Sequence, residues 1–368
     1  MSTFDAQTLL SELVSIPSVS GSEADVVDHV AGWCARRGFD CEGVGGGLVA
    51  RVARGGVGPT LLLTSHLDTV PAGSGWTGDP WSADWSEGRL VALGANDAKA
   101  SATGMLGALV AAAEDPEFRG TLLVALNARE ETDNAGMVEV LDHLDQRDVV
   151  LDAAVVGEPT NLEVVRSQAG LAVLTAHWQG VACHAAHVDR REHVNALALA
   201  AQELAAFGSY ALLPSEHPLF ERSTLVPTQL DSGNRHNVVP ADAEAVFDAR
   251  LAPDHDAAFV AAYLNEHLPG AEVRVRSDRL VPFDTPADAS IVRLALQLAG
   301  QRAASASSTL SDMALLGSVP AVKCGPGRTE RSHTANEYVT QGELHAGCAF
   351  YARLAIRSAE LACIGGSA

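Results

Sequence analysis

Residues Leu61-Leu62-Leu63-Thr64-Ser65-His66-Leu67-Asp68-Thr69-Val70-Pro71 join an apolar run to a histidine, one spacer residue and an aspartate. The apolar run predicts a buried strand. In α/β folds, functional sites form at the carboxyl ends of such strands. His66 is therefore a candidate metal ligand, and Asp68 is a candidate for holding its ring. A structural histidine is also typical of a strand end, so the interpretation depends on matching ligands elsewhere.

The length and composition indicate a globular protein with two domains. The chain has 368 residues, of which 47% are hydrophobic, and this is enough to fill sizeable cores. The formal charge is -21, from 46 acidic and 25 basic residues. Because phosphate binding needs clustered lysine and arginine, this charge argues against nucleic acid and against an anionic membrane as partners. It is typical of a soluble protein.

Targeting and cysteine patterns favour a cytoplasmic protein with reduced thiols. The N-terminal residues 1–5 contain no basic segment followed by an apolar stretch, so no signal peptide is expected. No apolar run reaches the roughly 18 residues of a membrane span. The cysteines lack C-x-x-C spacing, which argues against a disulfide framework and a cysteine zinc site; they are Cys34, Cys41, Cys183, Cys324, Cys348 and Cys363.

The order of apolar segments predicts an α/β domain that is interrupted by a smaller one. Residues 1–169 alternate helices with strands at 61–65, 121–125 and 152–156, which indicates a mostly parallel sheet covered by helices. A long loop is expected over residues 72–88. Residues 170–281 follow the order β-α-β-β-α-β of a ferredoxin-like α+β module. Residues 282–368 resume the first domain.

Polar residues follow the predicted strands or Gly-rich turns of the first domain. In a parallel sheet these positions gather on one edge. Carboxylates crowded together repel one another unless cations neutralise them. Two histidines with carboxylates and no thiolate suit two divalent metals, chiefly zinc, with one carboxylate left to handle a proton. The candidates are His66, Asp68, Asp97, Glu130, Glu131, Glu158 and His333.

Each of these candidates also has a simpler interpretation when it is taken alone. The pair Glu130 and Glu131 is typical of a solvated acidic turn. Asp97 and Lys99 are spaced like a surface ion pair, and Glu158 stands where a carboxylate faces a helix N-terminus. The occurrence of all these residues in order, each at a strand end or glycine turn, favours the metal site.

These residues resemble a known family over nearly the whole chain. It is the family of co-catalytic zinc amidohydrolases that includes acetylornithine deacetylase, succinyl-diaminopimelate desuccinylase, aminoacylase and glutamate carboxypeptidase. The motifs that carry the resemblance are the segments 65–71, Gly94-Ala95-Asn96-Asp97-Ala98-Lys99, Glu130-Glu131, Gly157-Glu158-Pro159-Thr160 and His333-Thr334-Ala335-Asn336-Glu337-Tyr338-Val339. The fold it implies is a zinc-peptidase-like sheet with an inserted dimerisation domain.

The resemblance also implies a role for each candidate. Asp97 would bridge two divalent metals, zinc or alternatively cobalt. His66 and Glu158 would complete one metal site, and Glu131 and His333 the other. Glu130 would be the general base that moves the proton of the attacking water to the leaving amine. Asp68 would orient His66.

The inserted module carries further implied roles. His184 matches a histidine that reaches the partner subunit's site in a homodimer and stabilises the oxyanion. The alternatives for this position are His187 or a plain loop histidine. Asn237 and Arg250 match substrate-binding positions, with an interface ion pair as the alternative for Arg250. Gly325, in Gly325-Pro326-Gly327, would allow close approach of the backbone to substrate.

The implied function is hydrolysis of an N-acyl amino acid, a small-molecule substrate. N-acetylornithine deacetylation in arginine biosynthesis is favoured. A succinyl-diaminopimelate desuccinylase, a related deacylase, a dipeptidase or a carboxypeptidase are the alternatives, and a relative that lost catalysis is a further one. The chain departs from the family at Arg129, where an acid is common, and in the loop after His184, which lacks a proline; Asn96 before Asp97 is a tolerable change.

Overall fold

The computed structural model describes residues 4–56 and 58–361 and divides into two compact units. The first unit comprises residues up to Arg166, Thr285–Ser305 and the residues from Ser311 onward. The second comprises Ser167–Asp284 and Ala306–Leu310. The grouping of Ala306–Leu310 with the second unit has no signal in the sequence. Residues 1–3 and Cys363 lie outside the described residues, and the remaining five cysteines are free thiols.

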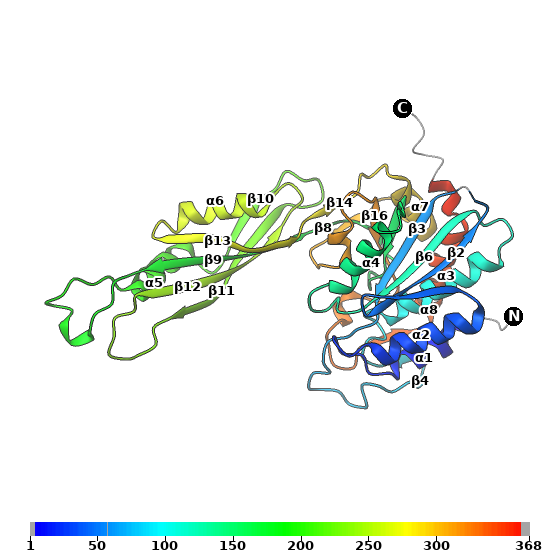
Figure 1. Cartoon of the computed structure of the whole chain (residues 1–368), viewed down its shortest axis with the longest axis horizontal. Coiled ribbons are helices and arrows are strands. Elements are labelled where there is room, and N and C mark those ends of the chain that lie inside the picture. The colour runs from blue at the N-terminus through cyan, green and yellow to red at the C-terminus, as the bar shows by residue number, and fades with distance from the viewer. Residues whose placement is uncertain (1–3, 57, 362–368) are drawn as a thin grey trace. The chain divides into compact units, whose positions relative to one another are not determined.

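The central sheet of the first unit is parallel at its middle and antiparallel at its edges (Figure 1). Its order is β1-β2-β6-β3-β7-β16-β8-β14, and the pairs β6–β3, β3–β7 and β7–β16 are parallel. This confirms the predicted mostly parallel sheet at its centre. The strands are β1 (Asp40–Val44), β2 (Gly47–Arg54), β3 (Thr60–His66), β6 (Gly120–Asn127), β7 (Ala153–Val156), β8 (Val165–Gln168), β14 (Phe283–Asp284), β15 (Ser305–Ser307), which pairs with β8, and β16 (Ala321–Lys323).

Helices cover this sheet and exclude water from its middle strands. Alternate residues of β3, such as Leu61 and Leu63, pack in a core with α2, α3, α7 and α8. On the other face, Thr64 lies against Met137 of α4. Strands buried on both faces read as continuous apolar runs, which is why the run at 61–63 predicts β3. The helices are α1 (Ala6–Val14), α2 (Ala24–Arg37), α3 (Lys99–Glu114), α4 (Ala135–Asp145), α7 (Ser290–Ala299) and α8 (Gln341–Ile356).

A small three-stranded sheet joins the loop over residues 72–88 to the C-terminal part of the chain. It contains β4 (Trp85–Ser86), β5 (Arg89–Val91) and β17 (Tyr338–Thr340) in the order β17-β5-β4. The predicted loop therefore ends in a short strand, because Trp85 pairs with Leu90 across a tight turn. β17 leads directly into α8, which begins at a capping box formed by Thr340 and Glu343.

The second unit is a five-stranded antiparallel sheet with two helices, as the ferredoxin-like pattern predicts. Its order is β10-β11-β12-β9-β13, in which β11, β12, β9 and β13 form the expected arrangement and β10 is an additional edge strand. Buried and half-buried residues alternate along β9, with Trp178 and Leu174 on the core face. The elements are β9 (Gly170–Gln179), α5 (Ala196–Phe207), β10 (Ala211–Pro214), β11 (Arg222–Ser232), β12 (Asp242–Leu251), α6 (Ala257–His267) and β13 (Ala271–Leu280).

Short 3-10 helices complete the described elements: η1 (Ala185–His187), η2 (Asp312–Leu315), η3 (Thr329–Arg331) and η4 (Ser358–Leu361). Asn195 and Asp256 cap the N-termini of α5 and α6 by accepting hydrogen bonds from main-chain N–H groups. Among the residues that the structure describes, no helix is both long and apolar enough to span a membrane.

The packing of α4 gives a prediction about stability. A Cβ atom at Gly136 would lie against the main-chain carbonyl of Ala128 and 2.8 Å from its nitrogen, whereas one at Gly342 in α8 would meet nothing within 4 Å. We expect Gly136→Ala to lower the free energy of unfolding by about 1–3 kcal/mol, because backbone cannot move aside as a side chain can. Urea unfolding followed by circular dichroism measures this.

Gly342→Ala is the matched control. It is expected to be neutral or to stabilise slightly, since alanine is the better helix former. Equal urea midpoints for the two variants would contradict close packing of α4 against the segment after β6.

Candidate active site

The residues that follow the parallel strands β3, β6 and β7 lie at one edge of the sheet. His66 ends β3 and pairs in register with Asn127, the last residue of β6. Glu130 and Glu131 follow β6 after two residues, and Glu158 follows β7 after one. The carboxyl ends of parallel strands share an edge, so these side chains meet there.

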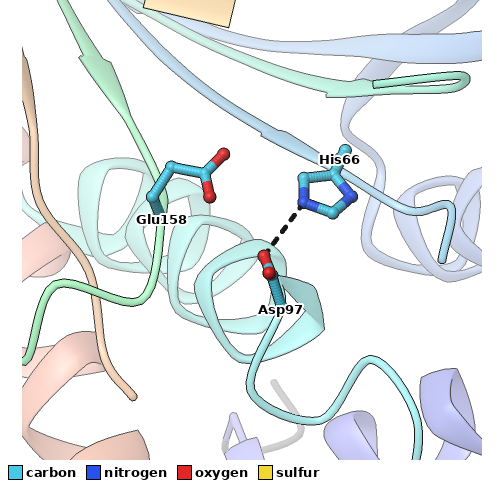
Figure 2. Close-up of side chains that lie close together, drawn as sticks. All are labelled: His66, Asp97 and Glu158. Carbon is cyan, nitrogen blue, oxygen red and sulfur yellow. Dashed lines mark hydrogen bonds and ion pairs between the residues drawn. The ribbon is translucent and has the colours of Figure 1, made fainter. Parts of the chain in front are cut away.

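Asp97 lies between the two histidines of the site. It stands immediately before α3, after the glycine turn that begins at Gly94, and it is 9% exposed. Its Oδ1 atom is 3.3 Å from Nε2 of His66, and its Oδ2 atom is 3.7 Å from Nε2 of His333. Figure 2 shows the carboxylate of Asp97 beside His66, with Glu158 directed toward the same space. One carboxylate thus presents one oxygen to each histidine.

The candidate donors fall into overlapping groups of the size that a metal ion needs. The ligand atoms within each group lie within 4.8 Å of one another. Asp97 belongs to two of the groups, and His66 and Glu131 also occur twice. The groups are His66 with Asp97 and Glu158, Asp97 with Glu131 and His333, and His66 with Glu130 and Glu131.

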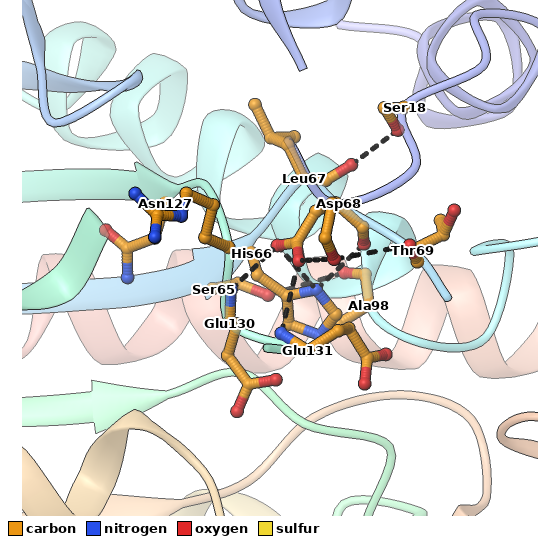
Figure 3. Close-up of polar contacts among 12 residues, drawn as sticks. Ser18, Ser65, His66, Leu67, Asp68, Thr69, Ala98, Asn127, Glu130 and Glu131 are labelled. Atoms are coloured by element: carbon orange, nitrogen blue, oxygen red, sulfur yellow. Dashed lines mark hydrogen bonds and ion pairs between the residues drawn. The ribbon is translucent and has the colours of Figure 1, made fainter. Parts of the chain in front are cut away.

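Asp68 organises both His66 and the pair Glu130 and Glu131. The ring Nδ1 of His66 is 3.0 Å from the main-chain oxygen of Asp68 and 3.5 Å from its Oδ1 atom. The Asp68 carboxylate accepts hydrogen bonds from the main-chain N–H groups of Glu130 and Glu131, each at 3.1 Å, and from the hydroxyl of Ser20 at 2.7 Å. The His66 ring is therefore oriented mainly by the main-chain oxygen of Asp68. The carboxylate of Asp68 fixes the turn that carries Glu130 and Glu131 (Figure 3).

The two glutamates of this turn point in different directions. Figure 3 shows their carboxylates separating as they leave neighbouring positions of the chain. Oε1 of Glu131 is 2.8 Å from Nε2 of His333, and this hydrogen bond raises the pKa of His333 to about 9. The His333 side chain is 51% exposed, whereas that of His66 is 1% exposed. The site therefore has a closed side and an open side.

The crowded, buried carboxyl groups of the site favour binding of a cation. Loss of water around the carboxyl of Glu130 raises its pKa well above the usual value, and burial beside Asp97 raises the pKa of Glu158 to about 8. Burial alone would lower the pKa of His66, but hydrogen bonds to Asp68 and Asp97 raise it well above 6.5. The nitrogen and carboxylate donors, without a thiolate, fit divalent metals such as zinc.

Several residues that support the site had no signal in the sequence pattern. Asp312, in η2, accepts hydrogen bonds from the side-chain amides of Asn127 at 2.8 Å and Asn134 at 3.1 Å. Burial raises its pKa to about 6. Asp312 follows no predicted strand, and its partners are the last residue of β6 and the N-cap residue of α4, so spacing alone did not identify it. Lys323, at the end of β16, is 2% exposed and its pKa is lowered by burial.

Three predicted residues belong to the second unit. His184 lies beside the segment that carries Asn237, since the N–H of Ala185 donates to the main-chain oxygen of Asn237 at 3.0 Å. The Nδ1 atom of His184 accepts a hydrogen bond from Ala186. Arg250 makes two hydrogen bonds with Asp248, at 2.9 and 3.2 Å. This pair lies within one strand, so it is neither the predicted substrate contact nor the interface ion pair considered as the alternative for Arg250.

Gly325 belongs to the first unit and lies next to Glu158. A Cβ atom at this position would be 2.5 Å from the hydroxyl oxygen of Ser101 and 2.6 Å from the main-chain oxygen of Glu158. Glycine is therefore required here by close packing of the chain that carries Glu158. His66, Asp68, Asp97, Glu130, Glu131, Glu158 and His333 come together in the first unit.

Known proteins are similar to this chain in sequence over most of its length. A desuccinylase from Methylorubrum extorquens, named succinyl-diaminopimelate desuccinylase, is 31% identical to this chain and covers 96% of it, with 99% of the relative aligned. A protein of the same name from Cereibacter sphaeroides is 31% identical over 278 residues, or 71% of this chain and 72% of the relative.

Solved structures share the fold. A tripeptidase from Staphylococcus aureus has a TM-score of 0.76 at 21% identity, covering 96% of this chain and 98% of its own. A dinuclear metal-binding peptidase of the M20 family from Bacillus subtilis has a TM-score of 0.74 at 14% identity, covering 98% of both chains. Residues 62–357 match the description Peptidase family M20/M25/M40. The chain belongs to the M20/M25/M40 peptidase family and is a metallohydrolase of that family.

Proposed function

We propose that this chain hydrolyses the amide bond of an N-acyl amino acid with two divalent metal ions, and that its substrate is a succinylated diamino acid. The position of Asp97 carries the metal part of this proposal, because its two carboxylate oxygens are directed at two different histidines. The names of the most similar relatives support the succinyl group.

Five side chains would hold the two ions. His66, Asp97 and Glu158 would bind one, and Asp97, Glu131 and His333 would bind the other. Zinc is the metal that this nitrogen and oxygen donor set fits best, with cobalt as an alternative. When bound, such ions polarise the scissile carbonyl and lower the pKa of the attacking water.

Glu130 is the residue left to move the proton. It lies among the same donors as His66 and Glu131, and its own N–H is fixed by Asp68. Loss of water around its carboxyl raises its pKa, which favours accepting a proton near neutral pH. In the proposed reaction Glu130 accepts the proton of the attacking water and donates it to the nitrogen of the leaving amine.

The choice of acyl group differs from the preference drawn from sequence. N-acetylornithine and a place in arginine biosynthesis have no support among the relatives, whose names instead favour a succinyl substrate, the alternative considered alongside it. An acidic acyl group would bring a second carboxylate, and Arg250 is the residue proposed to recognise a substrate carboxylate, with Asn237 as an alternative to its role described below. Arg250 would release the carboxylate of Asp248 and bind the substrate carboxylate instead. Both contacts are bidentate, with two hydrogen bonds from the guanidinium group.

The second unit would also contribute across a homodimer. The exposed position of His184 beside Asn237 supports a role in which both stabilise the negative oxygen that develops on the scissile carbonyl. In this proposal the pair serves the site of the partner subunit, and Gly325 lets the chain beside Glu158 approach the substrate.

The role of Glu130 gives the first functional prediction. Glu130→Gln keeps the shape of the side chain but removes the proton acceptor, so kcat is expected to fall about 10²- to 10⁴-fold. Metal content, measured by elemental analysis of the same preparation, is expected to remain that of the wild type. Loss of one ion in this variant would instead make Glu130 a ligand.

The raised pKa values give a prediction about the metal-free protein. Glu158 has a pKa of about 8 in the fold against an ordinary 4.5, so between pH 5 and 7 the unfolded chain releases its proton while the folded chain keeps it. The folded state therefore loses stability as pH rises. The urea midpoint of metal-free protein is expected to fall from pH 5 to 7.

Added Zn²⁺ is expected to raise the midpoint and to reduce this slope, because it replaces the proton on the carboxylates. The comparison uses the same buffers with and without the ion. A midpoint that Zn²⁺ does not change would argue against the metal site.

The substrate is tested by a panel assayed with Zn²⁺- and Co²⁺-loaded protein. We expect kcat/KM to be highest for N-succinyl-diaminopimelate, compared with N-acetylornithine, N-acetylcitrulline, N-acetylmethionine and dipeptides. Release of the free amine measures every member of the panel. Faster turnover of N-acetylornithine would contradict the proposed acyl group while leaving the metal mechanism intact.

A further inference from the structure

Two segments that are far apart in the sequence each carry a proposed metal ligand and contact each other closely. The first is the turn of residues 94–97, which carries Asp97. The second, here called the His333 segment, comprises residues 328–337. Both belong to the first unit. Each segment sends one side chain into the main chain of the other.

Asn96 extends from the turn to the His333 segment. Its Oδ1 atom accepts a hydrogen bond from the N–H of Arg328 at 2.7 Å. Its Nδ2 atom donates to the main-chain oxygen of Arg328 at 3.1 Å and to the hydroxyl of Ser332 at 3.3 Å. Asn96 is fully buried, and Gly327 leaves the space that its amide needs.

Glu337 makes the reverse contact. Its Oε1 atom accepts hydrogen bonds from the N–H groups of Asn96 at 2.8 Å and Asp97 at 2.9 Å, and its Oε2 atom accepts one from Gly94 at 3.3 Å. Glu337 is 2% exposed. A buried carboxylate that accepts three main-chain N–H groups fixes the backbone of the turn, and with it the position of Asp97.

We propose that Asn96 and Glu337 are positioning residues that form a reciprocal clamp between Asp97 and His333. Asn96 thereby sets the metal affinity of the open half of the site, and Glu337 sets that of both halves. This inference rests on the proposed two-metal function. His333 needs such support because its side chain is half exposed and its backbone has a φ of 59°. His66, in contrast, is held by a buried strand.

The two members of the clamp act on different ligands. Asn96 contacts the main chain of the His333 segment, so its loss affects His333 while Glu337 still holds the backbone of Asp97. Glu337 contacts the backbone of Asp97, which offers one oxygen to each half of the site. Loss of Asn96 should therefore weaken one ion selectively, and loss of Glu337 should weaken both.

The experiment titrates Co²⁺ into the metal-free full chain and follows binding by calorimetry and visible absorption. Wild type is expected to bind two ions. Asn96→Ala is expected to bind one ion as wild type does and the other about 10- to 100-fold more weakly, the usual cost of removing a group that orients a ligand. His333→Ala identifies that second event, because it should weaken the same one. Glu337→Gln should weaken both.

Gln301→Ala is the matched control. The Gln301 amide makes the same kind of contact, accepting from the N–H of Val164 at 3.0 Å and donating to the main-chain oxygen of Leu162 at 2.9 Å. It should leave both binding events unchanged. Asn96→Asp serves if the alanine variant does not fold, since it keeps the shape but replaces the Nδ2 donor with a negatively charged oxygen that repels the main-chain oxygen of Arg328.

Two results would overturn the clamp. One result is that Asn96→Ala and Asn96→Asp bind both ions with wild-type affinity. The other is that the affinity for both ions falls equally in these variants. A wild-type chain that binds fewer than two ions would instead overturn the proposed two-metal function, and the clamp with it. The number of ions bound by wild type thus separates the two failures.

Discussion

Mutual repulsion among carboxylates at one edge of a parallel sheet is the constraint on which this structure depends. Glu130, Glu131 and Glu158 converge because β6 and β7, the strands before them, both pair in parallel with β3, and Asp97 reaches the same edge from the turn before α3. Burial, with repulsion from neighbouring carboxylates added to it, raises the pKa values of Glu130 and Glu158. Metal ions and protons would therefore compete for these oxygens.

The edge is rigid because backbone groups, more than side chains, are fixed there. Asp68 binds the N–H groups of Glu130 and Glu131, Glu337 binds those of Gly94, Asn96 and Asp97, and Asp312 binds the amides of Asn127 and Asn134. In each case the carboxyl oxygens of an acidic residue accept hydrogen bonds that orient neighbouring groups. Such preorganisation holds the donors in place before an ion or substrate arrives.

The sequence predicted the parts of the molecule that depend on periodicity. Apolar runs gave the parallel strands, and the β-α-β-β-α-β order gave the ferredoxin-like module, because burial on one or two faces leaves a pattern along the chain. The seven residues gathered at the sheet edge were found because each follows a strand or a glycine turn. Asp312 and the contacts of Asn96 and Glu337 left no such trace. Asp312 binds side-chain amides far away in the sequence, and Asn96 and Glu337 bind mainly main-chain atoms of loops, so none of these contacts follows a periodic pattern. The preference for an acetyl substrate has no support among the relatives described above. Residues that recognise an acyl group leave no periodic pattern in a sequence, so the sequence could not decide between acyl groups.

The unequal exposure of the two histidines has a kinetic consequence. His66 is enclosed by a strand and by Asp68, whereas half of the His333 side chain faces solvent. In the proposed two-metal site, the ion held by His333 would therefore be more open to solvent than the ion held by His66. The ion held by His333 would then exchange faster with metal in the surrounding solution. The ion held by His66 would stay bound longer after the metal supply changes.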